Sequence, residues 1–204
     1  MGKTFVLTEG MNMYVNEATV EDNTVAVVYN DNTAAIAVAG NIAKYLTISV
    51  TGAHVNIAQS DDVAEEITYK LSGSSDDGEF YLSGSYKSTI ELNGLTLTNT
   101  NPVTSGAAVH IQNGKRIKVK VQDGTTNTIA DCANGSQKGA FYVKGHPEFS
   151  KSGVLNVIGN LKHAIKSGEY IELKEATLNV TPRPEASGCY LRFRRAGRLR
   201  TRGL

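Results

Sequence analysis

Three segments of the chain repeat one pattern: Gly106-Ala-Ala-Val-His-Ile111, Lys138-Gly-Ala-Phe-Tyr-Val143 and Lys162-His-Ala-Ile-Lys-Ser167. When the segments are superposed, Ala108, Ala140 and Ala164 fall in register. After each alanine, apolar and polar residues alternate, and a turn rich in glycine or asparagine follows. Alternation with a period of two predicts short β-strands that bury one face.

The distances between these segments separate a stack of coils from a meander of hairpins. An apolar residue stands nine positions after each alanine, at Ile117, Phe149 and Leu173. The later segments Leu155-Asn-Val157 and Leu178-Asn-Val180 are 23 residues apart. A unit of roughly 23 to 32 residues with three short strands is typical of a parallel β-helix, in which neighbouring coils bury each other's apolar faces. The predicted fold is therefore all-β, a parallel β-helix.

The alternation also predicts which residues face the core. The expected core residues of the first two faces are Val109, Ile111, Phe141, Val143, Ile165, Ile117, Val119, Val121, Phe149, Ile171 and Leu173. Outward positions are expected for Lys118, Lys120, Glu148 and Glu172 on the second face, and for Thr96, Asn156 and Asn179 on the third. Stacked coils place such outward residues in columns about 4.8 Å apart, which suits an extended, repeating polymer.

Three regions are predicted along the chain. Residues 1–64 are less regular, with strand candidates at 25–29, 34–39, 45–51 and 53–58, and are interpreted as an N-terminal β cap over the open end of the coils. Residues 65–181 carry the coils. Residues 182–204 hold seven of the eight arginines and no alternation. We interpret them as a disordered or non-native tail, with a basic arm that binds an anionic polymer as the alternative.

Composition excludes several classes of function. The 204 residues carry a formal net charge of +1, with 40% hydrophobic and 20% charged residues, which is typical of a globular protein and gives no general attraction to nucleic acid. No apolar run is long enough to span a membrane, and no signal peptide is visible at the N-terminus. The nucleophile elbow, the phosphate-binding loop and the dinucleotide fingerprint are absent, and Cys132 is expected to be a free thiol.

Longer stretches resemble a known family. They include Glu66-Ile-Thr-Tyr-Lys-Leu-Ser-Gly73, Leu92-Asn-Gly-Leu-Thr-Leu-Thr98, Ile111-Gln-Asn-Gly-Lys-Arg-Ile117 and His163-Ala-Ile-Lys-Ser-Gly168. Over roughly residues 40–181 the chain resembles bacterial carbohydrate-binding proteins whose right-handed parallel β-helix is similar to that of polysaccharide lyases. The resemblance implies an extracellular or cell-surface protein that binds plant cell-wall or acidic polysaccharides, in some cases with calcium. In the family, further coils follow the position of Thr181, and this sequence lacks them. The resemblance therefore implies a single-stranded right-handed parallel β-helix that is incomplete at its C-terminus.

The candidate carbohydrate-binding residues come from the outward positions. His110 and Tyr142 share a predicted outward column with Lys166, and an exposed aromatic ring can stack on a sugar face while polar neighbours bind the hydroxyls. Lys115 and Arg116 are added because a cationic pair suits an acidic sugar. There are two structural alternatives. In one, the column is an ordinary solvent-exposed face of the sheet, and in the other, Arg116 stabilises the stacked coils by donating hydrogen bonds to loop carbonyls.

A metal site and an enzymatic function are also weighed. Asp76 and Asp77 form an acidic turn that is the candidate calcium site, although an Asp-Asp-Gly sequence is also an ordinary turn. A calcium-dependent uronate lyase needs a base beside such a site, and only Lys115-Arg116 offers one. The predicted function is therefore non-catalytic binding of polysaccharide by a monomer, with the lyase and a structural surface adhesin as alternatives.

Overall fold

The computed structural model describes residues 20–183, together with the strands at residues 193–195 and 198–201. Nearly all of the regular structure is β-strand, and the described residues contain one short 3₁₀ helix, η1 (Ala43–Tyr45), and no α-helix. No helix in this part of the chain is long and apolar enough to cross a membrane. The predicted all-β class is confirmed.

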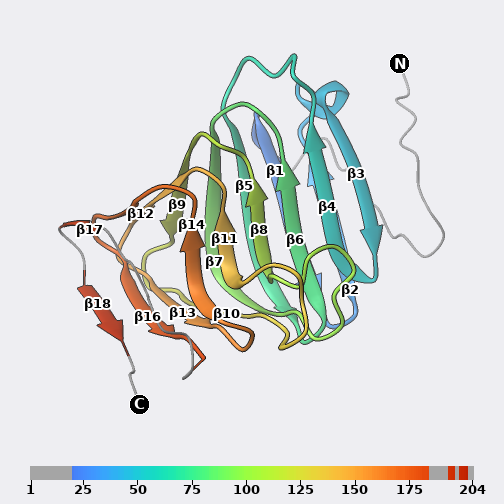
Figure 1. The fold of residues 1–204 in the computed structure, drawn as a ribbon. Helices are drawn as coiled ribbons and strands as arrows, with labels where there is room; N and C mark the ends of the chain where they lie inside the picture. The colour runs from blue at the N-terminus through green and yellow to red at the C-terminus, as the bar shows by residue number, and fades with distance from the viewer. Residues whose placement is uncertain (1–19, 184–192, 196–197, 202–204) are drawn as a thin grey trace.

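The strands form two sheets, one in front of the other in Figure 1. The smaller sheet has the order β14-β11-β8-β6-β4-β3. Its strands are β3 (Leu46–Thr51), β4 (Ala53–Gln59), β6 (Gly78–Ser83), β8 (Val109–Gln112), β11 (Gly139–Val143) and β14 (His163–Ser167). The larger sheet has twelve strands, and it contains β5 (Ile67–Ser75) and the long strand β7 (Ser88–Thr98). Its other strands are β1 (Thr24–Asn30), β2 (Thr33–Val38), β9 (Arg116–Val121), β10 (Thr126–Ala130), β12 (His146–Ser150), β13 (Val154–Ile158), β15 (Ile171–Leu173), β16 (Thr177–Thr181), β17 (Phe193–Arg195) and β18 (Arg198–Thr201).

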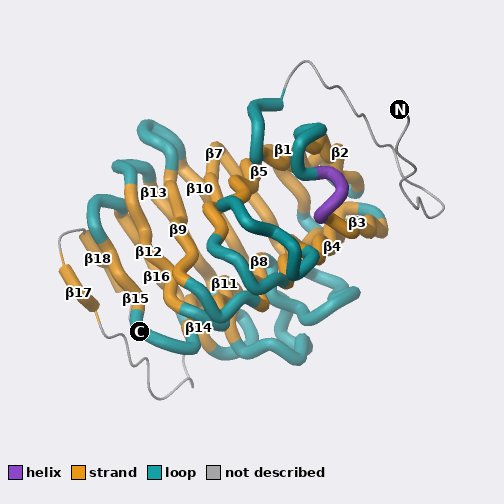
Figure 2. The backbone as a smooth tube through the Cα atoms, turned by 90° about the horizontal axis from the view of Figure 1, so that it is seen from above, coloured by secondary structure: helices purple, strands orange, loops and turns teal. Residues whose placement is uncertain are grey.

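Three successive repeats of three strands form the second half of the described chain. Strands β8, β9 and β10 pair in parallel with β11, β12 and β13, and these pair in parallel with β14, β15 and β16. The long strand β7 pairs with β9 through its first half and with β10 through its second half. Figure 2 shows the resulting rows of strands, joined by loops. Each residue therefore has its equivalent directly above or below it in the next repeat.

Three apolar columns meet between the strand rows and form the core. The column Phe80, Val109, Phe141 and Ile165 runs through the smaller sheet, and Ile90, Val119, Phe149 and Leu173 form a second column. Leu97, Ile129, Val157 and Val180 form the third. The centroids of the Phe141 and Phe149 rings are 5.7 Å apart, which joins the first column to the second. Every residue predicted to face the core is at most 7% exposed.

The pairing confirms one part of the predicted register and corrects another. Leu155 pairs with Leu178, as the 23-residue spacing predicts. Phe149 pairs with Leu173 but lies opposite Val119, and Ile117 lies opposite Pro147. The prediction that Ile117 is equivalent to Phe149 is therefore wrong by two residues. The reason lies between the paired residues of successive repeats: four residues separate Ile111 from Arg116, and two separate the equivalent Val143 and His146. Equal distances from the alanine therefore do not mark equal positions.

Two hairpins precede the repeats, and their strands lie close to the four predicted strand candidates. β1 pairs antiparallel with β2 and parallel with β5, while β4 pairs antiparallel with β3 and parallel with β6. Each hairpin thus continues one of the two sheets, and the interpretation of residues 1–64 as a cap stays a prediction.

The arginine-rich segment was expected to contain no regular structure. The backbone of β17 pairs in parallel with β15, and that of β18 pairs in parallel with β16, so these seven residues extend the larger sheet and differ from that expectation. Pro182 and Arg183 are described as well, and the Arg183 amide donates a hydrogen bond to the Lys162 carbonyl at 3.1 Å. The other residues of the predicted tail, Cys189 among them, lie outside the described residues. Cys132 is buried and is a free cysteine.

Close contact between turns explains two glycines of the repeat. A Cβ atom at Gly145 would overlap the carbonyl oxygen of Lys115, and one at Gly168 would overlap that of Lys144. The Gly145 amide donates a hydrogen bond to the Asn113 carbonyl at 2.9 Å. A side chain at these positions would push successive turns apart, so the stacking of repeats requires glycine here.

Candidate functional site

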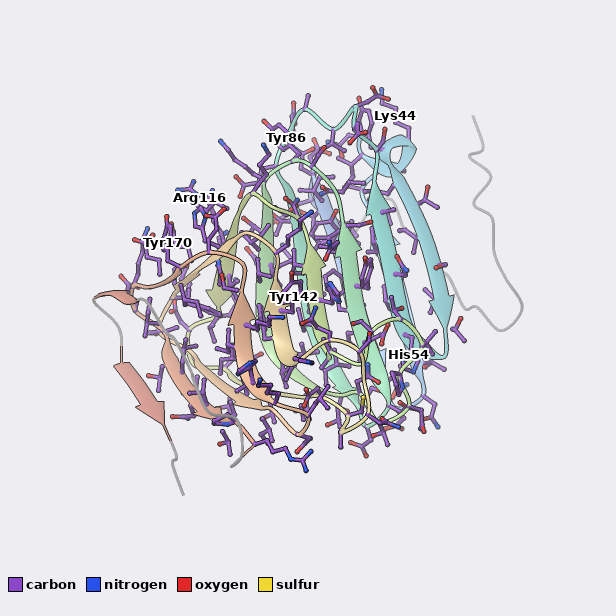
Figure 3. The ribbon with its side chains drawn as sticks, viewed as in Figure 1. Lys44, His54, Tyr86, Arg116, Tyr142 and Tyr170 are labelled. Atoms are coloured by element: carbon purple, nitrogen blue, oxygen red, sulfur yellow. The ribbon has the colours of Figure 1, made fainter. Side chains whose placement is uncertain are left out.

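An aromatic column runs across the outer face of the smaller sheet. The parallel register places Tyr81 of β6 beside His110 of β8, His110 beside Tyr142 of β11, and Tyr142 beside Lys166 of β14. Figure 3 labels Tyr142 near the middle of this sheet. The sequence predicted a column of His110, Tyr142 and Lys166, and the pairing confirms that the three residues share one. We call Tyr81, His110, Tyr142 and Lys166 the aromatic column.

The side chains of the aromatic column touch one another. The Tyr81 and His110 ring centroids are 4.6 Å apart, and those of His110 and Tyr142 are 4.8 Å apart in an edge-to-face arrangement. Lys166 Nζ lies 5.4 Å from the Tyr142 ring centroid, within the range of a cation–π contact. Both tyrosines are partly exposed. The column therefore offers amphipathic ring surface and one ammonium group. Ring surface can stack on a sugar ring, and the ammonium group can bind sugar hydroxyls.

His110 itself is covered, which corrects the prediction of an exposed ring. It occupies an outward position, yet only 7% of the residue is exposed. Its Nε2 lies 3.0 Å from Gln112 Oε1 and its Nδ1 lies 2.8 Å from Ser105 Oγ. Because an amide oxygen only accepts, Nε2 carries the proton and Nδ1 accepts from the serine hydroxyl. Burial lowers the pKa of His110, although the Gln112 bond opposes this effect.

The loop that carries Ser105 is fixed by two carboxylates at the N-terminal end of β6. The buried Glu79 carboxylate accepts hydrogen bonds from Asn99 Nδ2 at 2.7 Å and from the Thr104 amide at 2.9 Å. Asp77 accepts from the Asn101 amide at 2.8 Å and from Asn101 Nδ2 at 2.9 Å. These bonds hold the loop 99–107 in the position from which Ser105 reaches His110.

His54 lies between the same two carboxylates. Its Nε2 is 3.6 Å from Asp77 Oδ1, and its Nδ1 is 3.7 Å from Glu79 Oε2. The residue is 8% exposed, and the register places it beside Glu79. Figure 3 shows its label well below those of Arg116 and Tyr170. His54, Asp77 and Glu79 thus form a polar cluster under the loop, in which His54 and Glu79 are buried and Asp77 is partly exposed. We call this cluster the loop anchor.

The loop anchor gives a pH prediction. Burial by itself raises the pKa of Glu79, but the nearby His54 ring and the hydrogen bonds from the Thr104 amide and Asn99 Nδ2 more than offset it, so the pKa lies below the usual 4.5. A depressed pKa in the folded state means that the stabilisation is present above the unfolded pKa and is lost as the pH falls through the folded pKa. We expect the Thr104 amide resonance to shift in a ¹⁵N NMR titration with a midpoint below pH 4.5. A midpoint at or above that value would contradict the assignment.

The predicted calcium ligands are placed in this region too. Both carboxylate oxygens of Asp77 accept hydrogen bonds from the loop 99–107, and the Asp76 carbonyl accepts one from Thr100 Oγ1 at 2.6 Å. In the described part of the chain, no group of three or more His, Cys, Asp or Glu side chains is arranged to hold a metal ion. The geometry gives this acidic turn a structural use, and calcium binding there stays a prediction.

Lys115 and Arg116 are separate from the aromatic column. They lie at the turn into β9, and Arg116 is 43% exposed with its Nη1 3.7 Å from Glu148 Oε2. Lys174 Nζ is 2.7 Å from the other oxygen of the same carboxylate. Figure 3 shows Arg116 beside Tyr170, away from Tyr142. The five predicted sugar-binding residues therefore form two groups, one aromatic and one cationic, because β8 and β9 belong to different sheets.

The sequence named Tyr81 among the tyrosines available to a sugar but did not place it in the column of His110 and Tyr142, and it did not predict the loop anchor. Phe80-Tyr81-Leu82 repeats the pattern of Phe141-Tyr142-Val143, and the pairing of both with β8 shows that the two triplets are equivalent. This likeness was visible in the sequence. The loop anchor had no comparable signal, because His54, the pair Asp77 and Glu79, and the loop 99–107 that they hold come from three distant segments.

Comparison with known proteins now defines the class. The family of carbohydrate-binding domain-containing proteins matches residues 52–188, and the chain belongs to this family. The match covers the aromatic column, the loop anchor and all three repeats. A search of curated protein sequences finds no match.

One similar solved structure is that of the polysaccharide lyase-like protein from C. thermocellum, as a gadolinium derivative. It is 18% identical in sequence, with a TM-score of 0.60 over 76% of this chain. The similarity shows a shared fold. This chain spans 61% of the length of that structure.

Proposed function

We propose that this protein binds polysaccharide without cleaving it, through the aromatic column of a right-handed parallel β-helix. The family and the lyase-like fold support a carbohydrate-related role. The observation that carries the proposal is the continuous contact from Tyr81 through His110 to Tyr142 and Lys166. The three-strand repeats support the β-helix architecture. Their spacing of about 4.8 Å would give a polymer several equivalent contacts along one face.

Each member of the column has a defined part in this proposal. Tyr142 and Tyr81 present ring surface and a hydroxyl to the sugar. His110, held neutral and hydrogen bonded, spaces the two tyrosines and fixes their tilt. Lys166 donates hydrogen bonds and attracts a carboxylate where the glycan is acidic. The ligand class is plant cell-wall or acidic polysaccharide, and the site of action is the surface of a bacterial cell or the space outside it.

The binding test is affinity electrophoresis in gels that contain a soluble cellulose derivative, xylan or polygalacturonate, each with calcium and with a chelator. Retardation by one polymer is expected, and it would identify the ligand class. Loss of retardation in chelator would show that a metal takes part. No retardation of the folded protein by any polymer would contradict the proposal, and release of unsaturated sugars would favour the lyase alternative.

A single substitution then tests the column. We expect Tyr142→Ala to weaken binding of the retarding polymer by about tenfold or more, because aromatic anchors carry a large share of binding free energy. Tyr170→Ala is the matched control, since Tyr170 is also a half-buried tyrosine but stacks on His146 outside the column. Equal retardation of the two variants would contradict the role of Tyr142.

A further inference from the structure

A polar groove lies on the outer face of the larger sheet, away from the aromatic column. It has a volume of about 520 Å³, within the range of about 300–1,000 Å³ that ligand sites occupy. Its lining comes from β1, β5, β7 and the turn after β9: Ala26, Lys70, Leu71, Ser72, Glu91, Asn93, Gln122 and Asp123. The groove crosses neighbouring strands, so an extended polymer bound in it would also lie across the strands.

The concave shape has a local cause in the strand pairing. Leu71 of β5 pairs with Leu92, but Gly73 pairs with Leu95, so Asn93 and Gly94 together face Ser72. Such a bulge bends the strand and redirects side chains. It falls where β7 leaves its partner β9 and continues beside β10. The bend presents Asn93 toward the groove at the corner between the two halves of β7.

The charges of the groove are already paired within the protein. Lys70 Nζ is 2.7 Å from Glu21 Oε2, and Lys120 Nζ is 2.9 Å from Glu91 Oε1. Asp123 Oδ1 accepts from the amide and the hydroxyl of Ser152 at 2.7 and 2.8 Å. An anionic ligand would approach the carboxylates of Glu91 and Asp123, so the pairing favours an uncharged ligand.

Hydrogen-bonding groups remain for such a ligand. Within the described residues, no hydrogen bond is formed by the side chains of Ser72, Asn93 or Gln122, which are partly or fully exposed. Two amides and a hydroxyl can donate to and accept from vicinal sugar hydroxyls. Ala26 adds an apolar side chain to the lining, against which the C–H face of a sugar ring can pack.

We propose that this groove is a second glycan-binding site, selective for a neutral polysaccharide, that acts independently of the aromatic column. This proposal rests on the proposed function in one respect, that the ligand is a carbohydrate. Two sites on different sheets allow one molecule to contact two polymer chains at once, or two faces of one fibre. Simultaneous contact raises the overall affinity for a polymer above that of either site.

The test is NMR titration of the ¹⁵N-labelled chain with cellohexaose and, separately, xylohexaose, applied to three proteins. These are the wild type, Tyr142→Ala, and the double variant Asn93→Ala with Gln122→Ala, whose side chains lie at the surface and leave the core intact. We expect amide shifts at Asn93 and Gln122 in the wild type with at least one of the hexasaccharides. These shifts should persist in Tyr142→Ala, and the affinity measured at the groove should fall by about tenfold in the double variant.

The outcomes separate the groove from the proposed function. If Tyr142→Ala removes every sugar-induced shift, the proposal of a second site in the groove is overturned and the aromatic column stands. The same conclusion holds if the double variant binds both hexasaccharides like the wild type. If the folded wild type binds neither hexasaccharide, the neutral-glycan groove is overturned, while retardation in polygalacturonate gels still tests the column. Shifts confined to the groove would support the groove and show that the aromatic column does not bind these neutral sugars.

Discussion

Replacing Glu79 by alanine is expected to lower the free energy of unfolding by about 3–5 kcal/mol. The residue is 1% exposed and accepts hydrogen bonds from Asn99 and Thr104, with His54 nearby. Truncation removes the acceptor of the fully buried Asn99 amide and of the Thr104 amide, and a buried donor without its acceptor costs free energy. Urea unfolding followed by circular dichroism measures the change, and the loop 99–107 should lose amide protection in the same variant.

Two further variants separate the carboxylate from a general effect of truncation. Glu79→Gln keeps one acceptor oxygen but adds donors against the loop, so its loss of stability should be intermediate. Glu175→Ala removes an exposed carboxylate and should change stability by less than about 0.5 kcal/mol. A loss below about 1 kcal/mol for Glu79→Ala would mean that the carboxylate does not hold the loop in place.

Replacing Phe141 by alanine is expected to cost about 3–5 kcal/mol, the usual range for truncating a buried phenylalanine. Phe141 is fully buried between Val109 and Ile165, and its ring packs on Phe149. The variant opens a cavity where the first two apolar columns meet, so the loss affects both sheets. Guanidinium unfolding gives the free energy.

The size of the side chain is the variable that matters at this position. Phe141→Leu fills most of the space and should cost less than about 1.5 kcal/mol. Val103→Ala removes a side chain on a residue that is 57% exposed and should have little effect. If the alanine and leucine variants at 141 unfolded at the same denaturant concentration, the proposed central position of the ring would be wrong.

The sequence was sufficient for the parts of the fold that depend on alternation. Inward positions such as Val109, Phe141 and Leu173 follow from a period of two, and burial confirms them. The pairing of His110 with Tyr142 follows from superposed alanines. The register of Ile117 could not be obtained this way, because it depends on a turn whose length differs between repeats. Alternation predicts the face of a residue, whereas loop length decides which residues are equivalent.

The candidate site was predicted less completely than the fold. Alternation gave the outward position of His110 but could not show that Ser105 and its loop cover the ring. That loop is positioned by Glu79 and Asp77, whose hydrogen bonds join residues 20 or more positions apart. Lys115 and Arg116 were close to His110 in sequence, yet the turn after β8 carries them to another sheet. Tertiary contacts decide all three features, and no local pattern encodes them.

The most direct test of carbohydrate binding by the aromatic column is a crystal structure of the protein soaked with an oligosaccharide of the polymer that retards it. The account predicts sugar rings along the outer face of the smaller sheet, in contact with Tyr81, Tyr142 and Lys166. Unchanged solvent over these residues, in a crystal whose lattice leaves them open and at a saturating oligosaccharide concentration, would contradict it.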